Sequence, residues 1–288
     1  MGTVEFSRRA LERLLGINAE VVGVCTLQES KFNSDHVDLS VTCKAHDIPW
    51  MYAEDINSAE TLGWIKDKSP DVVFCFGWSR LLKQNLLGVA SLGVVGYHPA
   101  ALPANRGRHP LIWALVLGLE KTASTFFFMD AGADSGDIIS QREITIDSED
   151  NARSLYDKVI NCALDQIEEF VPQLATGTYQ RQKQDSQLAN TWRKRGGADG
   201  KINWRMFAHL IHNLVRGLAK PYAGANFIVD GQEVKVWKAI VVSDVPKNIE
   251  PGKVLMLKDS MPVVKCGEDA ICLLAFEPLI ELNVGRYL

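Results

Sequence analysis

The chain has 288 residues, of which 47% are hydrophobic, so it can bury a sizeable core and wholesale disorder is excluded. Its 31 lysines and arginines are outnumbered by 35 acidic residues, and the net charge of −4 argues against binding to a phosphate backbone. No apolar run reaches the roughly 20 residues of a membrane helix, no signal-peptide pattern opens the chain, and the six cysteines include no CxxC pair. These features predict a soluble cytoplasmic protein with reduced cysteines and no membrane partner.

The first half of the chain alternates strand-like and helix-like segments. A helix is predicted at residues 6–15, and Asn57 with Glu60 forms a predicted capping box for a helix that ends near Lys68. A further helix is predicted at residues 111–119. Short apolar runs predict buried strands at residues 20–26, 71–76, 93–97, 124–129 and 138–143. This alternation predicts a doubly wound, Rossmann-like α/β domain with a parallel sheet.

The longest predicted helix follows this alternating region. Apolar residues recur at intervals of three and four between residues 151 and 174, and Gly177 is placed to end the helix. Residues 179–200 are mostly polar, as in a linker. We therefore expect an N-terminal catalytic domain over residues 1–185.

The last third of the chain predicts a small, mainly β domain. It opens with an apolar helical stripe at residues 207–218, and an Asp-Gly pair at residues 230–231 between alternating strands is a strong hairpin signal. Short strands are predicted around Val254 and Val264. We expect this domain to span residues 199–288.

Two clusters of polar residues follow predicted strands. The first, GYHPAALPANRGRHP at residues 96–110, lies where open α/β sheets bind their ligands, just beyond the carboxyl end of a strand. The second, MDAGADSGD at residues 129–137, holds three carboxylates among small residues that let a backbone approach a ligand. Acidic turns with glycine are common, so the second cluster by itself fits an ordinary loop equally well.

Together the two clusters resemble the formyltransferase family that uses 10-formyltetrahydrofolate. HPAALPANRG and FFFMDAGADSGDII match its catalytic motifs, GTVEF its first loop, and FCFGWSRLL its folate-binding segment. RKRGGADGKINW and LAKPYAGANF are similar to the entry to its C-terminal β domain. The resemblance covers nearly the whole chain. It implies a methionyl-tRNA formyltransferase-like fold and transfer of a formyl group from 10-formyltetrahydrofolate to an amine.

The resemblance also implies which residues carry the reaction. Attack of an amine on a formyl carbon produces an oxyanion and an ammonium, so the site needs a base and hydrogen-bond donors. His98 matches the family's catalytic histidine, and Asp134 matches the catalytic aspartate that would orient the imidazole or relay its proton. Asp130 and Asp137 are interpreted as loop-forming residues.

The sequence departs from the family pattern at two places. The asparagine that normally stands two residues before the histidine is Gly96, and we hypothesise that Asn105 supplies the missing amide after the loop doubles back. Only Met1 precedes the GTVEF loop, where the family has a first, central strand. We therefore expect either a truncated chain or another segment in the place of that strand.

The family resemblance places the formyl donor between two segments. We expect contacts from Trp78, Ser79, Arg80, Leu81 and Leu82, and from Asp130, Gly132 and Ala133 in the acidic loop. Core packing is nearly as good an explanation for Leu81 and Leu82. The chain has no phosphate-binding glycine loop. His209 and His212 have no third ligand nearby, so no metal is expected.

The RGRHPLIWALVLG stretch is most similar to the sugar N-formyltransferases. The predicted amine is therefore carried by a nucleotide-linked amino-dideoxy sugar of polysaccharide biosynthesis. Its pyrophosphate would pair with arginine and lysine side chains, and the expected substrate-binding residues are Thr3, Arg106, Arg108, Arg193 and Lys194. Ordinary solvated surface is an equally good interpretation of the last two. The resemblance also implies a homodimer.

Two other functions stay open at this stage. A methionyl-tRNA formyltransferase would be favoured by a basic stripe on the folded surface. An inactive folate-binding homologue would account for the missing asparagine at Gly96, although His98 and Asp134 are both present.

Overall fold

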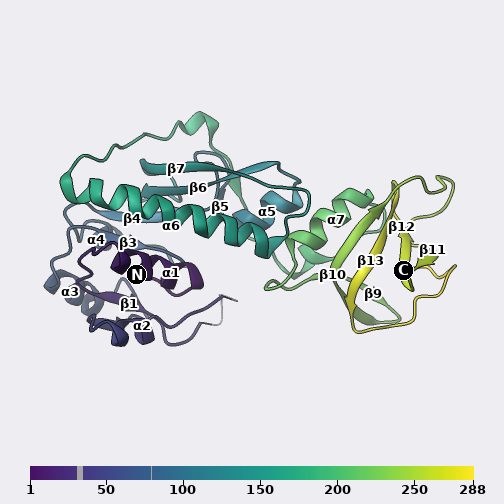
Figure 1. Ribbon diagram of the computed structural model, residues 1–288, viewed down its shortest axis with the longest axis horizontal. Helices are drawn as coiled ribbons and strands as arrows, with labels where there is room; N and C mark the ends of the chain where they lie inside the picture. The colour runs from purple at the N-terminus through teal and green to yellow at the C-terminus, as the bar shows by residue number, and fades with distance from the viewer. Residues whose placement is uncertain (31–34, 79) are drawn as a thin grey trace. The chain divides into compact units, whose positions relative to one another are not determined.

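The computed structural model describes residues 1–30, 35–78 and 80–288 (Figure 1). The chain forms two compact units, each built from several stretches of sequence. The first unit comprises Met1–Gly107, Ala123–Ile144 and Lys158–Trp192, and the second comprises Arg108–Thr122, Thr145–Asp157 and Arg193–Leu288. No helix within the described ranges is long and apolar enough to span a bilayer.

The main sheet that runs through the first unit is mixed. Its strand order is β3-β4-β6-β7, with β3 parallel to β4 and β4 antiparallel to β6. These strands span Val73–Cys75, Val94–His98, Lys121–Phe128 and Ile138–Thr145. A separate parallel pair is formed by β1 (Val24–Thr26) and β2 (Trp50–Tyr52). The predicted α/β class is confirmed, whereas the sheet has an antiparallel edge that the sequence analysis did not anticipate.

The helices α1 (Glu5–Gly16), α3 (Ala59–Asp67) and α6 (Ala152–Thr176) begin and end close to the predicted positions. Two short helices, α2 (Ser40–Ala45) and α4 (Gln84–Leu87), were not predicted. The predicted cap of α3 was wrong by one residue, because the Ser58 side chain accepts the Thr61 N–H. Asn57 instead bridges two backbone groups, donating to the Leu81 carbonyl and accepting from the Lys83 N–H. It therefore holds the residue 81–83 segment in place.

Aromatic side chains form the centre of the first unit. The Phe6 ring of α1 lies 4.4 Å from the ring of Tyr97 on β4, and Phe126 on β6 lies 4.8 Å from both Tyr97 and Phe170 of α6. Such tilted pairs add about 0.5–1.5 kcal/mol each beyond the area they bury. The cluster fixes β4, which ends at His98.

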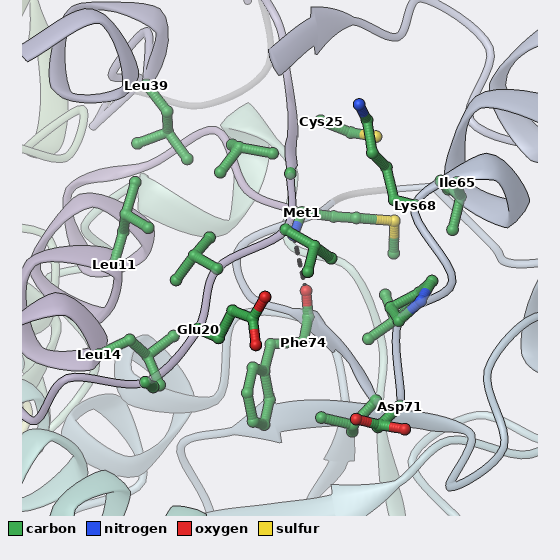
Figure 2. A pocket seen from close by; sticks show the side chains of 18 of the residues that line it. Met1, Leu11, Leu14, Glu20, Cys25, Leu39, Ile65, Lys68, Asp71 and Phe74 are labelled. Atoms are coloured by element: carbon green, nitrogen blue, oxygen red, sulfur yellow. Dashed lines mark hydrogen bonds between the residues drawn. The ribbon is translucent and has the colours of Figure 1, made fainter. Parts of the chain in front are cut away.

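A cavity of about 400 Å³ separates β1 from β3 (Figure 2). At its end Met1 donates through its ammonium to the Phe74 carbonyl of β3, and Gly2 donates to the Cys25 carbonyl of β1. Met1 and Gly2 thus lie as a strand end between the two sheets. Among the described residues, no other segment lies between β1 and β3 as a strand.

The second unit packs helices against an antiparallel sheet. Its helices are α5 (Pro110–Val116) and α7 (Ala208–Gly217), and its strand order is β11-β12-β13-β10-β9. The strands span Ala225–Val229 (β9), Gln232–Val242 (β10), Val254–Lys258 (β11), Met261–Lys265 (β12) and Ala270–Glu277 (β13). The predicted hairpin is confirmed, because positive φ angles at Asp230 and Gly231 turn the chain between β9 and β10. Strand β13 was not predicted.

Candidate active site

His98 is the last residue of β4, and its side chain is almost completely buried. Its Nε2 lies 2.8 Å from the Asn105 carbonyl oxygen. A carbonyl can only accept a hydrogen bond, so Nε2 carries the proton of the neutral ring and Nδ1 keeps its lone pair. The basic nitrogen of His98 is therefore Nδ1.

A carboxylate faces that nitrogen. Asp134 Oδ2 lies 3.8 Å from His98 Nδ1, and the two side chains are 23% and 6% exposed. The distance exceeds a direct hydrogen bond, so the pair interacts through charge. An ionised Asp134 would stabilise the positive charge that His98 acquires when it accepts a proton.

Backbone contacts hold Asp134 in this position. Its Oδ2 accepts the Gly107 N–H at 3.0 Å, and its φ angle of +54° is left-handed. Gly107 belongs to β5 (Arg106–Gly107), which pairs with β8 (Thr191–Trp192). A Cβ at Gly107 would lie 2.3 Å from the Trp192 carbonyl oxygen, so only glycine permits this approach. The arginine-glycine pair thus brings an N–H to the aspartate.

The acidic loop closes on itself through Asp130. Its Oδ1 accepts the Gly132 N–H at 2.9 Å and the Ser135 hydroxyl at 2.7 Å. A Cβ at Gly136 would lie 1.8 Å from the Phe128 carbonyl oxygen. These contacts support the interpretation of Asp130 as a loop-forming residue. They leave Gly132 and Ala133 exposed at the tip of the loop.

The polar stretch interpreted as a linker supplies residues that sequence reasoning missed. Gln184 donates to the carbonyls of Asp134 and Gly136, at 2.9 and 2.7 Å, and accepts from the Arg106 guanidinium. Asn190 accepts the Asn105 N–H at 2.6 Å. Isolated amide residues in a polar segment give no local signal of such roles. Arg106, expected to bind substrate, is thereby tied to the loop that carries Asp134.

The loop that carries Asn105 returns to His98, and a methionine fills the space beside Gly96. The loop does double back, since the Asn105 carbonyl reaches the His98 ring and Asn105 has a left-handed φ of +64°. A Cβ at Gly96 would lie 2.8 Å from Cγ and 3.1 Å from Sδ of Met129, so that side chain fills the space beside residue 96. The part of Asn105 in catalysis stays a proposal.

The segment expected to bind folate has both core and exposed residues. Leu82 is buried and packs in the core with Leu86, whereas Leu81 is 77% exposed. Trp78 packs against the same core, and its buried Nε1 has no hydrogen-bond partner among the described residues. Arg80 donates to the Glu54 carbonyl. Ser79 lies outside the described residues. Folate binding by this segment stays a prediction.

Thr3, expected to bind substrate, is buried. Its hydroxyl donates to the Gly77 carbonyl at 2.9 Å, and its own carbonyl accepts the Val37 N–H. The GTVEF loop is thereby fixed next to the segment that carries Trp78.

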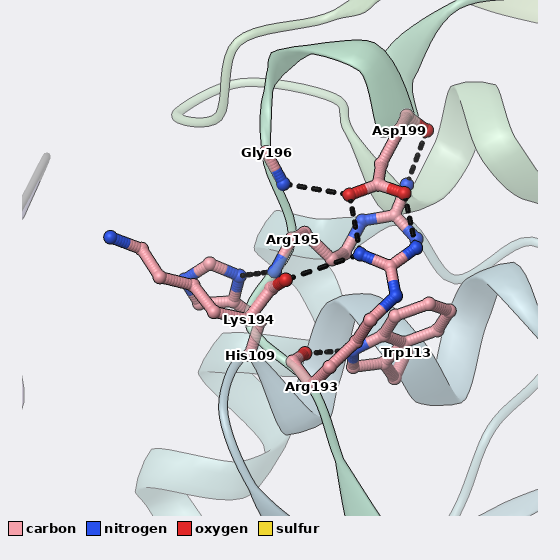
Figure 3. Close-up of polar contacts among 7 residues, drawn as sticks. All are labelled: His109, Trp113, Arg193, Lys194, Arg195, Gly196 and Asp199. Atoms are coloured by element: carbon pink, nitrogen blue, oxygen red, sulfur yellow. Dashed lines mark hydrogen bonds and ion pairs between the residues drawn. The ribbon is translucent and has the colours of Figure 1, made fainter.

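Three other expected substrate-binding residues, Arg108, Arg193 and Lys194, belong to the second unit. Arg108 is exposed and lies close enough to His109 to lower its pKa, and Figure 3 shows Arg193 and Lys194 with Trp113 and His109. Arg193 forms a bidentate pair with Asp199, at 2.8 and 2.5 Å, and its carbonyl accepts the Trp113 indole N–H. Arg195 lies over the Trp113 ring at 4.6 Å. Lys194, between the two arginines in the chain, is exposed. Arg193 thus has a structural partner, and Lys194 is the better placed to meet a ligand.

Comparison with known proteins gives two matches to family sequence models. The model described as formyl transferase matches residues 13–168, and the model described as formyl transferase, C-terminal domain, matches residues 196–279. A methionyl-tRNA formyltransferase of Caldanaerobacter subterraneus is 32% identical over 100% of this chain and 94% of its own length.

Solved structures share the fold at lower identity. WlaRD, described as a sugar 3N-formyl transferase and solved with dTDP and 5-N-formyl-THF, has a TM-score of 0.72 at 17% identity, covering 94% of both chains. An N-formyltransferase of Helicobacter canadensis, solved with folinic acid and dTDP-3-aminofucose, has a TM-score of 0.70 at 17% identity, covering 94% of this chain and 96% of its own.

Proposed function

We propose that the acceptor of this protein is the amine of a nucleotide-linked amino-dideoxy sugar. The premise is that the chain belongs to the formyl transferase family and is therefore a formyltransferase enzyme. The formyl donor of the family is 10-formyltetrahydrofolate. The observation that carries the chemistry is the His98 ring, with its basic Nδ1 towards Asp134 and its Nε2 bonded to the Asn105 carbonyl.

The arrangement supports the following roles. The acceptor amine attacks the formyl carbon, and Nδ1 of His98 takes the proton that the new C–N bond makes acidic. Asp134 stabilises the resulting imidazolium, which returns the proton to the donor nitrogen as the old C–N bond breaks. The Asn105 amide is the proposed donor to the oxyanion. A general base of this kind contributes about 10²–10⁴-fold to a rate.

Charge supports a compact anionic acceptor. The chain carries a net charge of −4, yet Arg108, Lys194 and Arg195 of the second unit all lie close enough to His109 to lower its pKa. Arg193, next to them in the chain, pairs with Asp199. A local cluster of this kind suits one diphosphate group. A long nucleic-acid backbone would favour a more extended basic surface.

Methionyl-tRNA is the second candidate acceptor. The observation in its favour is the 32% identity to a methionyl-tRNA formyltransferase over the whole of this chain. A single assay compares the two: the protein is incubated with 10-formyltetrahydrofolate and either a panel of nucleotide-linked amino sugars or methionyl-tRNA. Mass spectrometry should show one added formyl group on one amino sugar, and this product should disappear in His98→Ala. Formylation of methionyl-tRNA alone would refute the sugar proposal.

A further inference from the structure

His109 stands at the start of α5 with a left-handed φ of +57°. This backbone turns its ring towards the segment that carries Lys194 and Arg195, where Nδ1 accepts the Arg195 N–H at 3.3 Å. Because that hydrogen bond uses the Nδ1 lone pair, the proton of the neutral ring is on Nε2. His109 therefore presents an Nε2–H donor.

The charges around this ring are nearly all positive. Burial lowers the pKa of His109, and Arg108, Lys194 and Arg195 lower it further. The carboxylate of the cluster, Asp199, is engaged by Arg193 and by the Gly196 N–H. The ring is therefore neutral at pH 7 and above, in a strongly positive environment.

Lys194 and Arg195 keep positive charge close to the His109 ring. Figure 3 shows Lys194 extending on the His109 side of the cluster, away from Asp199. Arg195 is only 9% exposed and is held by the Asp199 carbonyl at 2.6 Å and by the face of Trp113. A buried guanidinium fixed in this way supplies a constant field that the exposed Lys194 ammonium reinforces.

We propose that His109 is an anion-binding residue whose Nε2–H acts with Lys194 and Arg108 on the diphosphate of the substrate, and that diphosphate binding is coupled to protonation of the His109 ring. The inference rests on the proposed function in taking a nucleotide-linked sugar as the ligand. The second proton goes to Nδ1 and breaks the hydrogen bond from the Arg195 N–H. A bound anion offsets the three surrounding cations, so the protonated ring becomes more stable. By reciprocity, protonation of the ring strengthens binding of the anion.

Free His109 has a lowered pKa and the anion raises it, so a proton is taken up between these two values. Affinity is then higher at pH 6 than at pH 8. One proton limits the change to about tenfold per pH unit.

The test uses UDP-glucose and dTDP-glucose, which have no amine and cannot be formylated. Their diphosphates are diesters with constant charge from pH 6 to 8, so any pH dependence comes from the protein. Titration calorimetry at pH 6, 7 and 8, in two buffers of different ionisation enthalpy, measures both the affinity and the proton uptake. The wild type should bind one probe about 3- to 30-fold more tightly at pH 6 than at pH 8, with proton uptake.

Three variants separate the roles. His109→Gln keeps an N–H donor that cannot titrate, so its affinity should stay near the wild-type value at pH 8 and lose its pH dependence. Lys194→Met should weaken binding at every pH and keep the pH dependence. Lys247→Met removes an exposed lysine elsewhere in the second unit and should change neither. Thermal unfolding of each variant checks that it folds.

Several outcomes overturn the inference: no binding of either probe at millimolar concentration, pH-independent wild-type binding, or an unchanged pH dependence in His109→Gln. Formylation of an amino sugar together with any of these would leave the proposed function standing without the role of His109. Conversely, His109-dependent binding without formylation of any amino sugar would refute the function and leave the anion site.

Discussion

The pairing of Asp134 with His98 makes a quantitative prediction for Asp134→Asn. The asparagine can still accept the Gly107 N–H, so the loop should keep its shape. What is lost is a negative charge 3.8 Å from His98 Nδ1. If this charge stabilises the imidazolium in the transition state, turnover must fall while substrate binding stays largely intact.

The size of the effect follows from the distance. Two unit charges about 4 Å apart interact by about 4 kcal/mol at an effective dielectric constant of 20. Asp134 is 23% exposed, and solvent screening reduces the contribution to about 1.5–3 kcal/mol. That range corresponds to a loss of about 10- to 150-fold in kcat, with KM changed much less.

The assay is steady-state formylation of the identified acceptor, with Asp137→Asn as a matched control from the same loop. Asp134→Asn is also compared with His98→Ala and with the double variant. Because Asp134 is argued to act through the ring, its substitution should have almost no effect once His98 is absent. A wild-type kcat in Asp134→Asn, or equal losses in the presence and absence of His98, would refute the reasoning.

Three further predictions concern stability, each measured by urea unfolding. Gly96→Ala should lower the free energy of unfolding by about 1–3 kcal/mol, because its Cβ would press on Met129. Adding Met129→Ala should restore part of that loss. Unchanged stability in Gly96→Ala would contradict this packing. An extension of five apolar residues ahead of Met1 should raise the free energy of unfolding by roughly 2–5 kcal/mol, because it would enter the cavity between β1 and β3 as a strand. A glycine-serine extension of the same length should not raise it. Burial and neighbouring arginines lower the pKa values of His109 and His212, and a lysine also lowers that of His109. As the pH falls, both histidines therefore bind protons in the unfolded chain before they do so in the folded one. The free energy of unfolding should then fall below about pH 6.5, by up to about 1.4 kcal/mol per pH unit per histidine. A double His→Gln variant should show a flatter profile, and an unchanged slope would rule out this source.

Periodic apolar patterns predicted the elements that are buried on one face. The stripe of α6 and the strand β4 were found within two residues of their predicted limits, because packing decides both. The Asp230-Gly231 turn was equally readable, since few residues tolerate two successive positive φ angles. An element can therefore be predicted from its own residues where one buried face or one turn determines its structure.

Long-range contacts decided what the sequence did not reveal. The run at residues 20–26 forms a strand only at Val24–Thr26, beside the cavity that residues 19–25 help to line. The order that places β6 antiparallel to β4 depends on pairing between distant segments. Gln184 joins the loops of Arg106 and Asp134 from a segment with no pattern of its own. Hydrogen bonds of this kind depend on where the backbone passes, which residue type alone does not specify.

The same side chain is given opposite electrostatic surroundings at two points of one motif. His98 has the Asp134 carboxylate 3.8 Å from its basic nitrogen, which suits a group that must accept a proton from an amine. His109 has three cations around it, which disfavour the charged ring and keep it a neutral donor until an anion arrives. Motif matching treats the two histidines as letters of one pattern. Their roles differ because their neighbours differ: a carboxylate, Asp134, in one case, and three cations, Arg108, Lys194 and Arg195, in the other.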